Sequence, residues 1–148
     1  MSLVNSEAGL IKLEYDIVQN DFSRAGEASS NLKKVLKQLG VPHQIIRRVA
    51  IAAYEAEINI VIHSNGGKIT AKISPEYIVL IAKDNGPGIK DIKLAMTEGY
   101  STASNKVREM GFGAGMGLPN IKRCADVFDI QSKKDSTQVT IKISFNLE

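Results

Sequence analysis

The chain has 148 residues, of which 43% are hydrophobic and 24% are charged, and its formal net charge is +3. That length suits a single domain with a real core, and the composition excludes disordered and collagen-like chains. The small basic excess is scattered along the chain and gives little indication of nucleic-acid or membrane binding. We therefore expect residues 1–148 to form one domain.

Cysteine content and the N-terminal sequence narrow the class of protein further. Cys124 is the only cysteine, so an intrachain disulfide or a cysteine-based metal cluster cannot form. Its apolar neighbours predict a small, buried side chain. No basic segment followed by an apolar one opens the chain, and no apolar run approaches the ~20 residues of a membrane span. These features predict a cytoplasmic protein.

The first elements in chain order are a strand and a helix. Apolar and polar residues alternate over residues 11–17, which predicts a half-buried strand. A helix should follow, with Asp21 or Ser23 as its cap, and should run to about Leu39. Gly40 should end it.

A second helix is predicted directly after the first. Pro42 suits its first turn, and the helix should run to about His63, before the pair Gly66 and Gly67. Its apolar residues recur at helical spacing and should face the core: Ile45, Val49, Ala52, Ala56 and Ile60.

The second half of the chain predicts strands around one long loop. Residues 69–73 and 77–82 read as two strands joined by a turn. Residues 84–117 hold seven of the chain's twelve glycines, and so long a loop inside a compact domain is usually functional. A helix should follow from Gly117 to about residue 125, and then strands over residues 127–130 and 139–145.

This order of elements predicts the fold class. Short links between several strands favour a mixed, mostly antiparallel sheet over a doubly wound parallel one. We expect an α/β (α+β) two-layer sandwich, in which about three amphipathic helices cover one face of the sheet.

Two polar residues on the second predicted helix could carry chemistry. Glu55 and Asn59 are four residues apart, so their side chains lie on one helix face. On spacing alone, the pair also fits a solvated helix face. The neighbouring residues are mostly apolar, however, and carboxylates are seldom fully buried without a partner. Side by side, a carboxylate and an amide oxygen can hold a hard cation.

A second candidate segment, residues 84–89, has the sequence DNGPGI and directly follows an apolar strand. Asp84 offers an acceptor, and Gly86 and Gly88 offer backbone that a ligand can approach closely. A plain tight turn is the alternative, because Asn-Gly and Pro-Gly are common turn dipeptides.

A third segment has a glycine at every second position from Gly111 to Gly117, just before a predicted helix. Free N–H groups and the helix dipole at such a helix start can cradle phosphate. A flexible hinge is the alternative. The segment is neither a Walker A motif nor a dinucleotide fingerprint.

Together, the three segments resemble the ATP site of the GHKL (Bergerat-fold) superfamily of gyrase-type, Hsp90-type and histidine-kinase ATPases. Residues 55–59 look like the N box, residues 84–89 like the G1 box and residues 111–118 like the G2 box, in the family's order. The resemblance implies a Bergerat fold with an ATP lid at about residues 90–110. Within the superfamily the chain most resembles the anti-sigma-factor serine/threonine kinases, and among them the stressosome switch kinases. The segments that carry this closer likeness are residues 98–102, 115–123 and 126–130.

The resemblance also implies roles for single residues. Glu55 would be the catalytic base, Asn59 would bind Mg²⁺, and Asp84 would accept a hydrogen bond from the adenine amino group. The residues that would contact ATP are Asn59, Asp84, Gly86, Gly88, Ile89, Gly111, Gly113, Gly115, Gly117, Leu118 and Thr137. Lys106 and Arg108 are candidate lid cations, whereas Tyr100, Ser101 and Thr102 have no assigned role. The chain departs from the family pattern at Ser136, where a glycine is common, and in a lid lengthened by residues 103–110.

By this resemblance we expect an ATP- and Mg²⁺-dependent protein serine/threonine kinase. Its substrate would be a STAS-like antagonist protein, and it would regulate a partner such as a sigma factor. The alternative is an ATP-switched regulatory binding module with little or no kinase activity. Glu55 favours the kinase, because a pure ATP sensor does not need a base. No nucleic-acid or membrane partner is expected, and a homodimer is left open.

Overall fold

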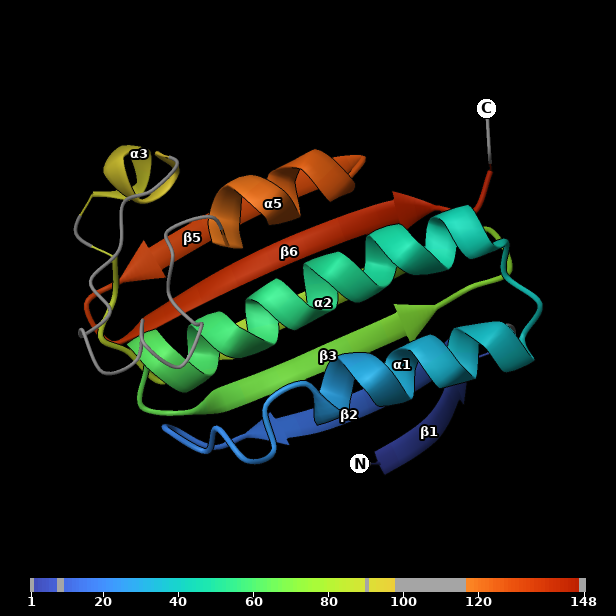
Figure 1. The fold of residues 1–148 in the computed structure, drawn as a ribbon, viewed down its shortest axis with the longest axis horizontal. Helices are drawn as coiled ribbons and strands as arrows, with labels where there is room; N and C mark the ends of the chain where they lie inside the picture. Colours follow the sequence, from blue (N-terminus) through green and yellow to red (C-terminus); the bar gives the residue numbers. More distant parts are fainter. Residues whose placement is uncertain (1, 8–9, 90, 98–116, 147–148) are drawn as a thin grey trace.

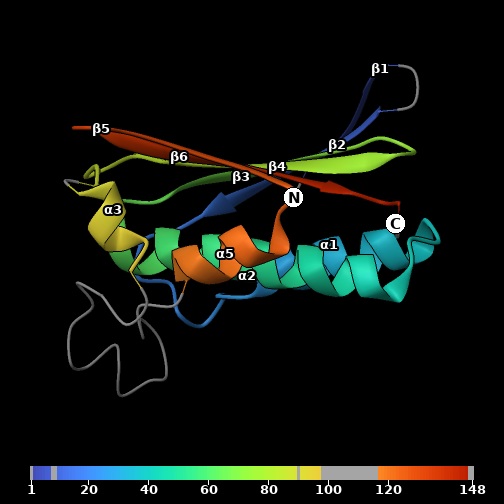
Figure 2. The ribbon, with the colours of Figure 1, turned by 90° about the horizontal axis from the view of Figure 1, so that it is seen from above.

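A computed structural model of the protein describes residues 2–7, 10–89, 91–97 and 117–146. The strands in these ranges are β1 (Ser2–Glu7), β2 (Leu10–Ile17), β3 (Gly67–Ile73), β4 (Tyr77–Asp84), β5 (Val127–Lys133) and β6 (Ser136–Ser144). The helices are α1 (Glu27–Gln38), α2 (His43–His63), α3 (Ile92–Ala95) and α5 (Gly117–Cys124). Figure 2 shows the sheet in one layer and α1, α2 and α5 in the other, which confirms the expected two-layer α/β (α+β) sandwich.

The strands form a single sheet in the order β1-β2-β3-β4-β6-β5. We expected a mixed, mostly antiparallel sheet, but all five pairings among the described strands are antiparallel. Short turns join β3 to β4 and β5 to β6, and such hairpins pair antiparallel. Strand β1 extends the sheet beyond β2, although its sequence carries no clear alternation that would predict it.

The core lies between the sheet and the helices. On each central strand, alternate side chains point to the helices and are buried, as the two-residue period of a strand requires. All five residues predicted for the apolar face of the second helix are buried. Cys124 is only partly buried, at the end of α5, and this burial raises the pKa of its thiol.

Helix α1 begins later than predicted. It starts at Glu27, because residues 19–26 form turns in which neither Asp21 nor Ser23 caps a helix. Gly26 at the N-cap has a φ of 100°, in the left-handed region that glycine tolerates, and it has no side chain with which to cap. The cap therefore comes from another part of the chain.

The carboxylate of Glu57 on α2 supplies that cap. Its Oε2 accepts from the backbone N–H groups of Gly26 (3.0 Å) and Ala28 (3.2 Å), and its Oε1 from that of Ser29 (3.1 Å). Glu57 is 2% exposed, so these bonds replace water for donors that the first helical turn leaves free. Burial, followed by the charge of Glu57, raises the pKa of Tyr15 to about 12.

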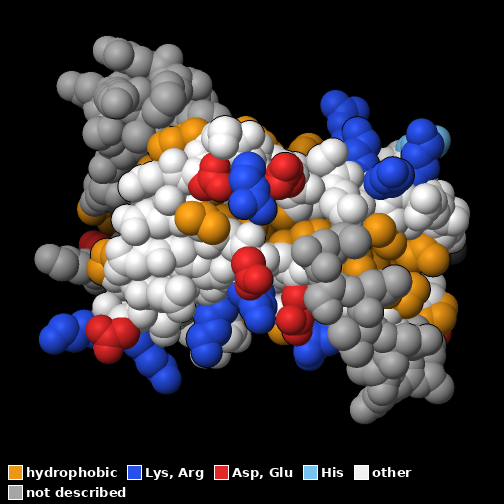
Figure 3. Space-filling view, turned by 90° about the horizontal axis from the view of Figure 1, so that it is seen from below, with side chains coloured by type: hydrophobic (Ala, Val, Ile, Leu, Met, Phe, Trp, Pro, Cys, Tyr) orange, Lys and Arg blue, Asp and Glu red, His pale blue; other side chains and the backbone are white. Residues whose placement is uncertain are grey.

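Among the described residues, no helix is both long enough and apolar enough to cross a bilayer. On the molecular face seen in Figure 3, acidic and basic side chains are neighbours in the middle and at the lower left, whereas basic side chains and a histidine gather at the upper right. Arg24, for instance, lies within salt-bridge distance of both Asp21 and Glu27. Opposite charges are thus neighbours over part of this face.

Replacing Glu57 should test the cap. We expect Glu57→Ala to lower the free energy of unfolding by about 3 kcal/mol, because it leaves buried N–H groups without an acceptor. Urea denaturation would measure the change. Glu76→Ala removes a glutamate from the exposed β3–β4 turn and should change stability by no more than about 0.5 kcal/mol. Equal stability of the two variants would contradict the assigned cap.

Candidate functional site

The segments predicted to form the site come together at one end of the molecule. In Figure 1, three elements lie toward the same end of the molecule: the C-terminal half of α2, the start of α5 and the β5–β6 turn. Strand β4 also ends there, because Lys83 pairs with Gln138 beside that turn. The antiparallel sheet thus gathers elements that are distant in sequence.

Part of the predicted site falls on residues 98–116, which lie outside the described ranges. This segment includes predicted phosphate-binding glycines and lid residues, namely Gly111, Gly113, Gly115, Tyr100, Ser101, Thr102, Lys106 and Arg108. Neither of two pockets formed by described residues is lined by a predicted site residue. One, of about 270 Å³, is lined by Tyr15 and Glu57 among others, and the other, of about 400 Å³, by Leu39 and Phe145 among others.

Glu55 and Asn59 lie against the first turns of α5. The Oε2 atom of Glu55 accepts a hydrogen bond from the side-chain amide of Asn120 at 2.9 Å. One turn further along α2, Asn59 borders Gly117, where an added Cβ would lie 3.0 Å from Asn59 Oδ1. Both polar side chains are half-buried. They therefore lie between two helices rather than on an open, solvated helix face.

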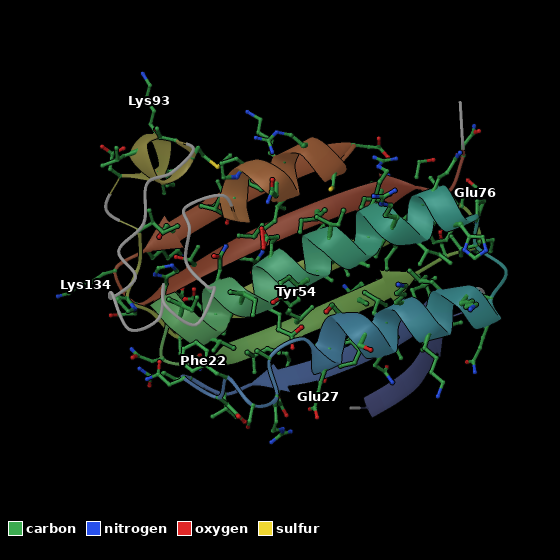
Figure 4. All side chains as sticks on the ribbon, viewed as in Figure 1. Phe22, Glu27, Tyr54, Glu76, Lys93 and Lys134 are labelled. Atoms are coloured by element: carbon green, nitrogen blue, oxygen red, sulfur yellow. The ribbon has the colours of Figure 1, made fainter. Side chains whose placement is uncertain are left out.

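Tyr54, beside Glu55 in the sequence, marks the outer side of α2. It lies on the side of α2 away from the sheet and is 38% exposed (Figure 4). Partial burial, and then the charges of Glu55 and Glu57, raise the pKa of its hydroxyl. The surface next to Glu55 thus carries an exposed aromatic ring in its neutral form.

Asp84 ties the end of β4 to the β5–β6 hairpin. Its Oδ1 accepts from the backbone N–H groups of Gly86 and Thr137, each at 2.9 Å. Thr137, one of the residues predicted to contact ATP, thus contacts Asp84 through its main chain. The hydroxyl of the buried Thr137 lies 2.8 Å from Ser132 Oγ, which accepts from Ile89 N–H at 2.6 Å.

The glycines of residues 84–89 meet the hairpin at very short range. A Cβ on Gly86 would lie 2.7 Å from the Asp135 carbonyl oxygen, and one on Gly88 would overlap that of Lys133. Gly88 N–H also donates to the Lys134 carbonyl at 3.1 Å. We expected these glycines to admit a nucleotide; close packing of the hairpin is a second reason for them.

The far end of α5 is fixed by a residue that the sequence did not single out. Arg48 on α2 donates from Nε (3.0 Å) and Nη2 (2.7 Å) to the carbonyl of Cys124, and from Nη2 (3.0 Å) to Asp126. Asp126 also accepts from the N–H of Ser144, and this bond contributes most to the lowered pKa of Asp126. A cation at the last carbonyls of a helix satisfies free acceptors and complements the helix dipole.

Asn120, Arg123 and Ser132 were also missed as site residues. A weak signal exists for the first two: they are three residues apart in the predicted helix, away from the apolar Ile121. Nothing in the local sequence indicates that Asn120 reaches Glu55 on α2, or that Ser132 reaches residues 84–89.

Residues 18–143 match a family described as a histidine kinase-like ATPase domain. The chain belongs to this family. The match spans α1 to residue 143 of β6, so every predicted site residue that the structure describes lies within it. The GHKL assignment, whose superfamily includes the histidine-kinase ATPases, is therefore confirmed.

Curated relatives support the same assignment for this histidine kinase-like ATPase domain. The serine/threonine-protein kinase RsbT of Bacillus subtilis (strain 168) is 34% identical over 104 residues, which cover 68% of this chain and 72% of that protein. The anti-sigma F factor of Clostridium novyi (strain NT) is 31% identical over 114 residues, 72% of this chain and 76% of that protein. That of Clostridium kluyveri (strain NBRC 12016) is 32% identical over 104 residues, 66% and 70% of the two chains. The expected likeness to anti-sigma-factor kinases is thus confirmed.

A substitution at Gly88 should test how the hairpin packs in this ATPase-family domain. We expect Gly88→Ala to lower the free energy of unfolding by about 3 kcal/mol, because the methyl group overlaps the Lys133 carbonyl. Urea denaturation would measure it. Gly40→Ala is the control, because its methyl group would meet open space. Only the left-handed φ of 77° at residue 40 disfavours alanine, so we expect the free energy of unfolding to fall by about 1 kcal/mol. A smaller loss in Gly88→Ala than in Gly40→Ala would refute this packing.

Proposed function

We propose that residues 1–148 form a single, cytoplasmic kinase domain that transfers phosphate from ATP to serine or threonine in a protein. The observation that carries the proposal is the contact of α2 with α5, which brings a carboxylate and an amide to the start of a helix. Membership of a histidine kinase-like ATPase family supports ATP as the nucleotide. A relative named as a serine/threonine-protein kinase supports a protein hydroxyl as the acceptor.

In this proposal Asp84 selects adenine. Two backbone N–H groups already bind its Oδ1 atom, which holds the carboxylate in one orientation. The second oxygen, Oδ2, would accept from the adenine amino group, and Gly86, Gly88 and Ile89 would line the base and ribose. The phosphates would lie at the start of α5, at Gly117 and Leu118, together with the preceding glycines. Free N–H groups at a helix start bind anions in this way.

Asn59 is the proposed ligand of Mg²⁺. Its amide oxygen is a hard donor, and Gly117 places the start of α5 beside it without an intervening side chain. The residues present therefore fit the ion. When bound, Mg²⁺ neutralises charge on phosphate oxygens.

Glu55 is the proposed catalytic base. It would orient the hydroxyl of the acceptor and take its proton as the hydroxyl oxygen bonds to the γ-phosphorus of ATP. The bond from that phosphorus to the bridging oxygen breaks, and ADP leaves. Phosphoryl transfer asks mainly for positioning and charge stabilisation, so one carboxylate suffices as the base.

The proposed acceptor is a STAS-like antagonist protein, and a sigma factor is a candidate regulated partner. The relatives named anti-sigma F factors support this class of partner. An ATP-switched binding module without transfer is the second candidate function. Glu55 favours the kinase, because a module that only senses ATP needs no base beside the start of α5.

Nucleotide binding can be tested at Asp84 with little effect on the fold. In Asp84→Asn the amide keeps an oxygen for the two backbone N–H groups but turns a donor toward the adenine amino group. We expect ATP to bind about 30-fold more weakly, since a donor facing a donor loses a charge-assisted hydrogen bond. Calorimetric titration with ATP and MgCl₂ would measure this. Asp129→Asn removes an equal charge from an exposed site on β5 and should bind like the parent; equal affinities in both variants would refute the adenine site.

Transfer can be separated from binding at Glu55. Glu55→Gln keeps an oxygen that can accept from Asn120 but cannot take a proton. We expect transfer of labelled γ-phosphate to STAS-like candidate proteins to fall at least about 100-fold, with ATP affinity within about twofold of the parent. Phosphoserine analysis would measure the transfer. Undiminished transfer would rule out Glu55 as the base, whereas a parent that binds ATP but modifies no candidate would favour the binding module.

A further inference from the structure

Asn120 links Glu55 to a cation on α5. Its Nδ2 atom donates to Glu55 Oε2 at 2.9 Å, and its Oδ1 atom accepts from Arg123 Nη1 at 2.7 Å. A guanidinium can only donate and an ionised carboxylate can only accept. One orientation of the amide satisfies both neighbours, and the opposite orientation would satisfy neither. Arg123 therefore fixes which end of Asn120 faces Glu55.

We propose that Asn120 is a positioning residue for phosphoryl transfer, which holds the Glu55 carboxylate in the orientation that takes the acceptor's proton. This inference rests on the proposed role of Glu55 as the base. With Oε2 bound to Asn120, the other oxygen, Oε1, is the one that receives the proton. A base must lie within hydrogen-bond reach of its proton, and a misplacement of about 1 Å can cost about 100-fold in rate.

Glu55 is only half-buried, so its carboxylate needs a partner such as Asn120 to fix its orientation. A glutamate has three side-chain torsions, and no backbone constraint fixes its carboxylate plane. Its opposite neighbour on α2, Glu57, is held by three backbone N–H groups and is buried. Glu55 has a side-chain partner from another helix instead, so its orientation depends on where α5 lies.

Arg48 keeps α5 within reach of Glu55. It binds the Cys124 carbonyl through two nitrogens at the far end of α5, four residues beyond Asn120. The same helix is proposed to hold the phosphates at its start. Helix α5 would thus bind the phosphates at its start and orient Glu55 through Asn120. The amide of Asn120 contacts Glu55 and is not one of the proposed phosphate ligands. Its loss should slow transfer without weakening the binding of ATP.

Two variants separate this role from simple packing between α2 and α5. Asn120→Ala removes the amide. Asn120→Asp keeps the size of the side chain and the acceptor for Arg123, but sets a second carboxylate against Glu55 in place of the donor. If Asn120 only fills space between the helices, Asn120→Asp should keep the parental rate of ATP cleavage that Asn120→Ala loses. If Asn120 positions Glu55, Asn120→Asp should lower that rate at least as much as Asn120→Ala does. Lys122→Ala is the matched control, since Lys122 is exposed on the same helix.

The measurement is single-turnover cleavage of γ-labelled ATP with MgCl₂, with water as the acceptor, together with calorimetric ATP affinity and melting temperature. We expect Asn120→Ala and Asn120→Asp to be about 10- to 100-fold slower than the parent, with ATP affinity within about twofold. Lys122→Ala should match the parent. A folded Asn120→Asp variant that cleaves ATP at the parental rate would overturn the inference while leaving the proposed function intact. A parent that binds ATP but shows neither cleavage nor transfer would overturn the proposed function, and the inference with it.

Discussion

The packing of α2 is the constraint on which the rest of the structure depends. Its apolar face lies on the sheet, while α1 and α5 run along its two sides (Figure 1). Each residue of a helix turns the side-chain direction by about 100°, so side chains two positions apart point to nearly opposite sides. Glu57 therefore reaches α1, and Glu55 reaches α5. Asn59, four residues beyond Glu55, returns to the side of α5.

Glu57 and Glu55 differ in burial, and this difference suits them to different roles. Glu57 is 2% exposed and accepts three backbone hydrogen bonds, so its charge is compensated entirely within the fold and serves the start of α1. Glu55 is half-buried and is held by one side-chain amide. A carboxylate that keeps some exposure and has a single side-chain partner can still exchange a proton with a substrate. The histidine kinase-like ATPase fold thus uses one helix for both stability and proposed chemistry.

The part of the site formed by residues 84–89 depends on the β5–β6 hairpin. The β5–β6 turn packs so closely on residues 84–89 that Gly86 and Gly88 have no room for a side chain. Asp84 binds both its own turn and the start of β6, and Ser132 joins the same network. Glycine-rich motifs of this kind carry two constraints at once, because the backbone must meet its own fold as well as any ligand.

Local patterns in the sequence determined much of this protein. Period-two and helical spacing predicted most strands and the apolar face of α2, and the order of three motifs indicated the GHKL superfamily. Glu55 and Asn59 could be placed on one face because helix geometry is local. The start of α1, strand β1 and the contacts made by Arg48, Asn120 and Ser132 were decided only by the tertiary structure. Asn120 is 65 residues from Glu55, and Cys124 is 76 residues from Arg48. Contacts of that range arise because two helices share a sheet, and no periodicity within either helix encodes which side chains then meet.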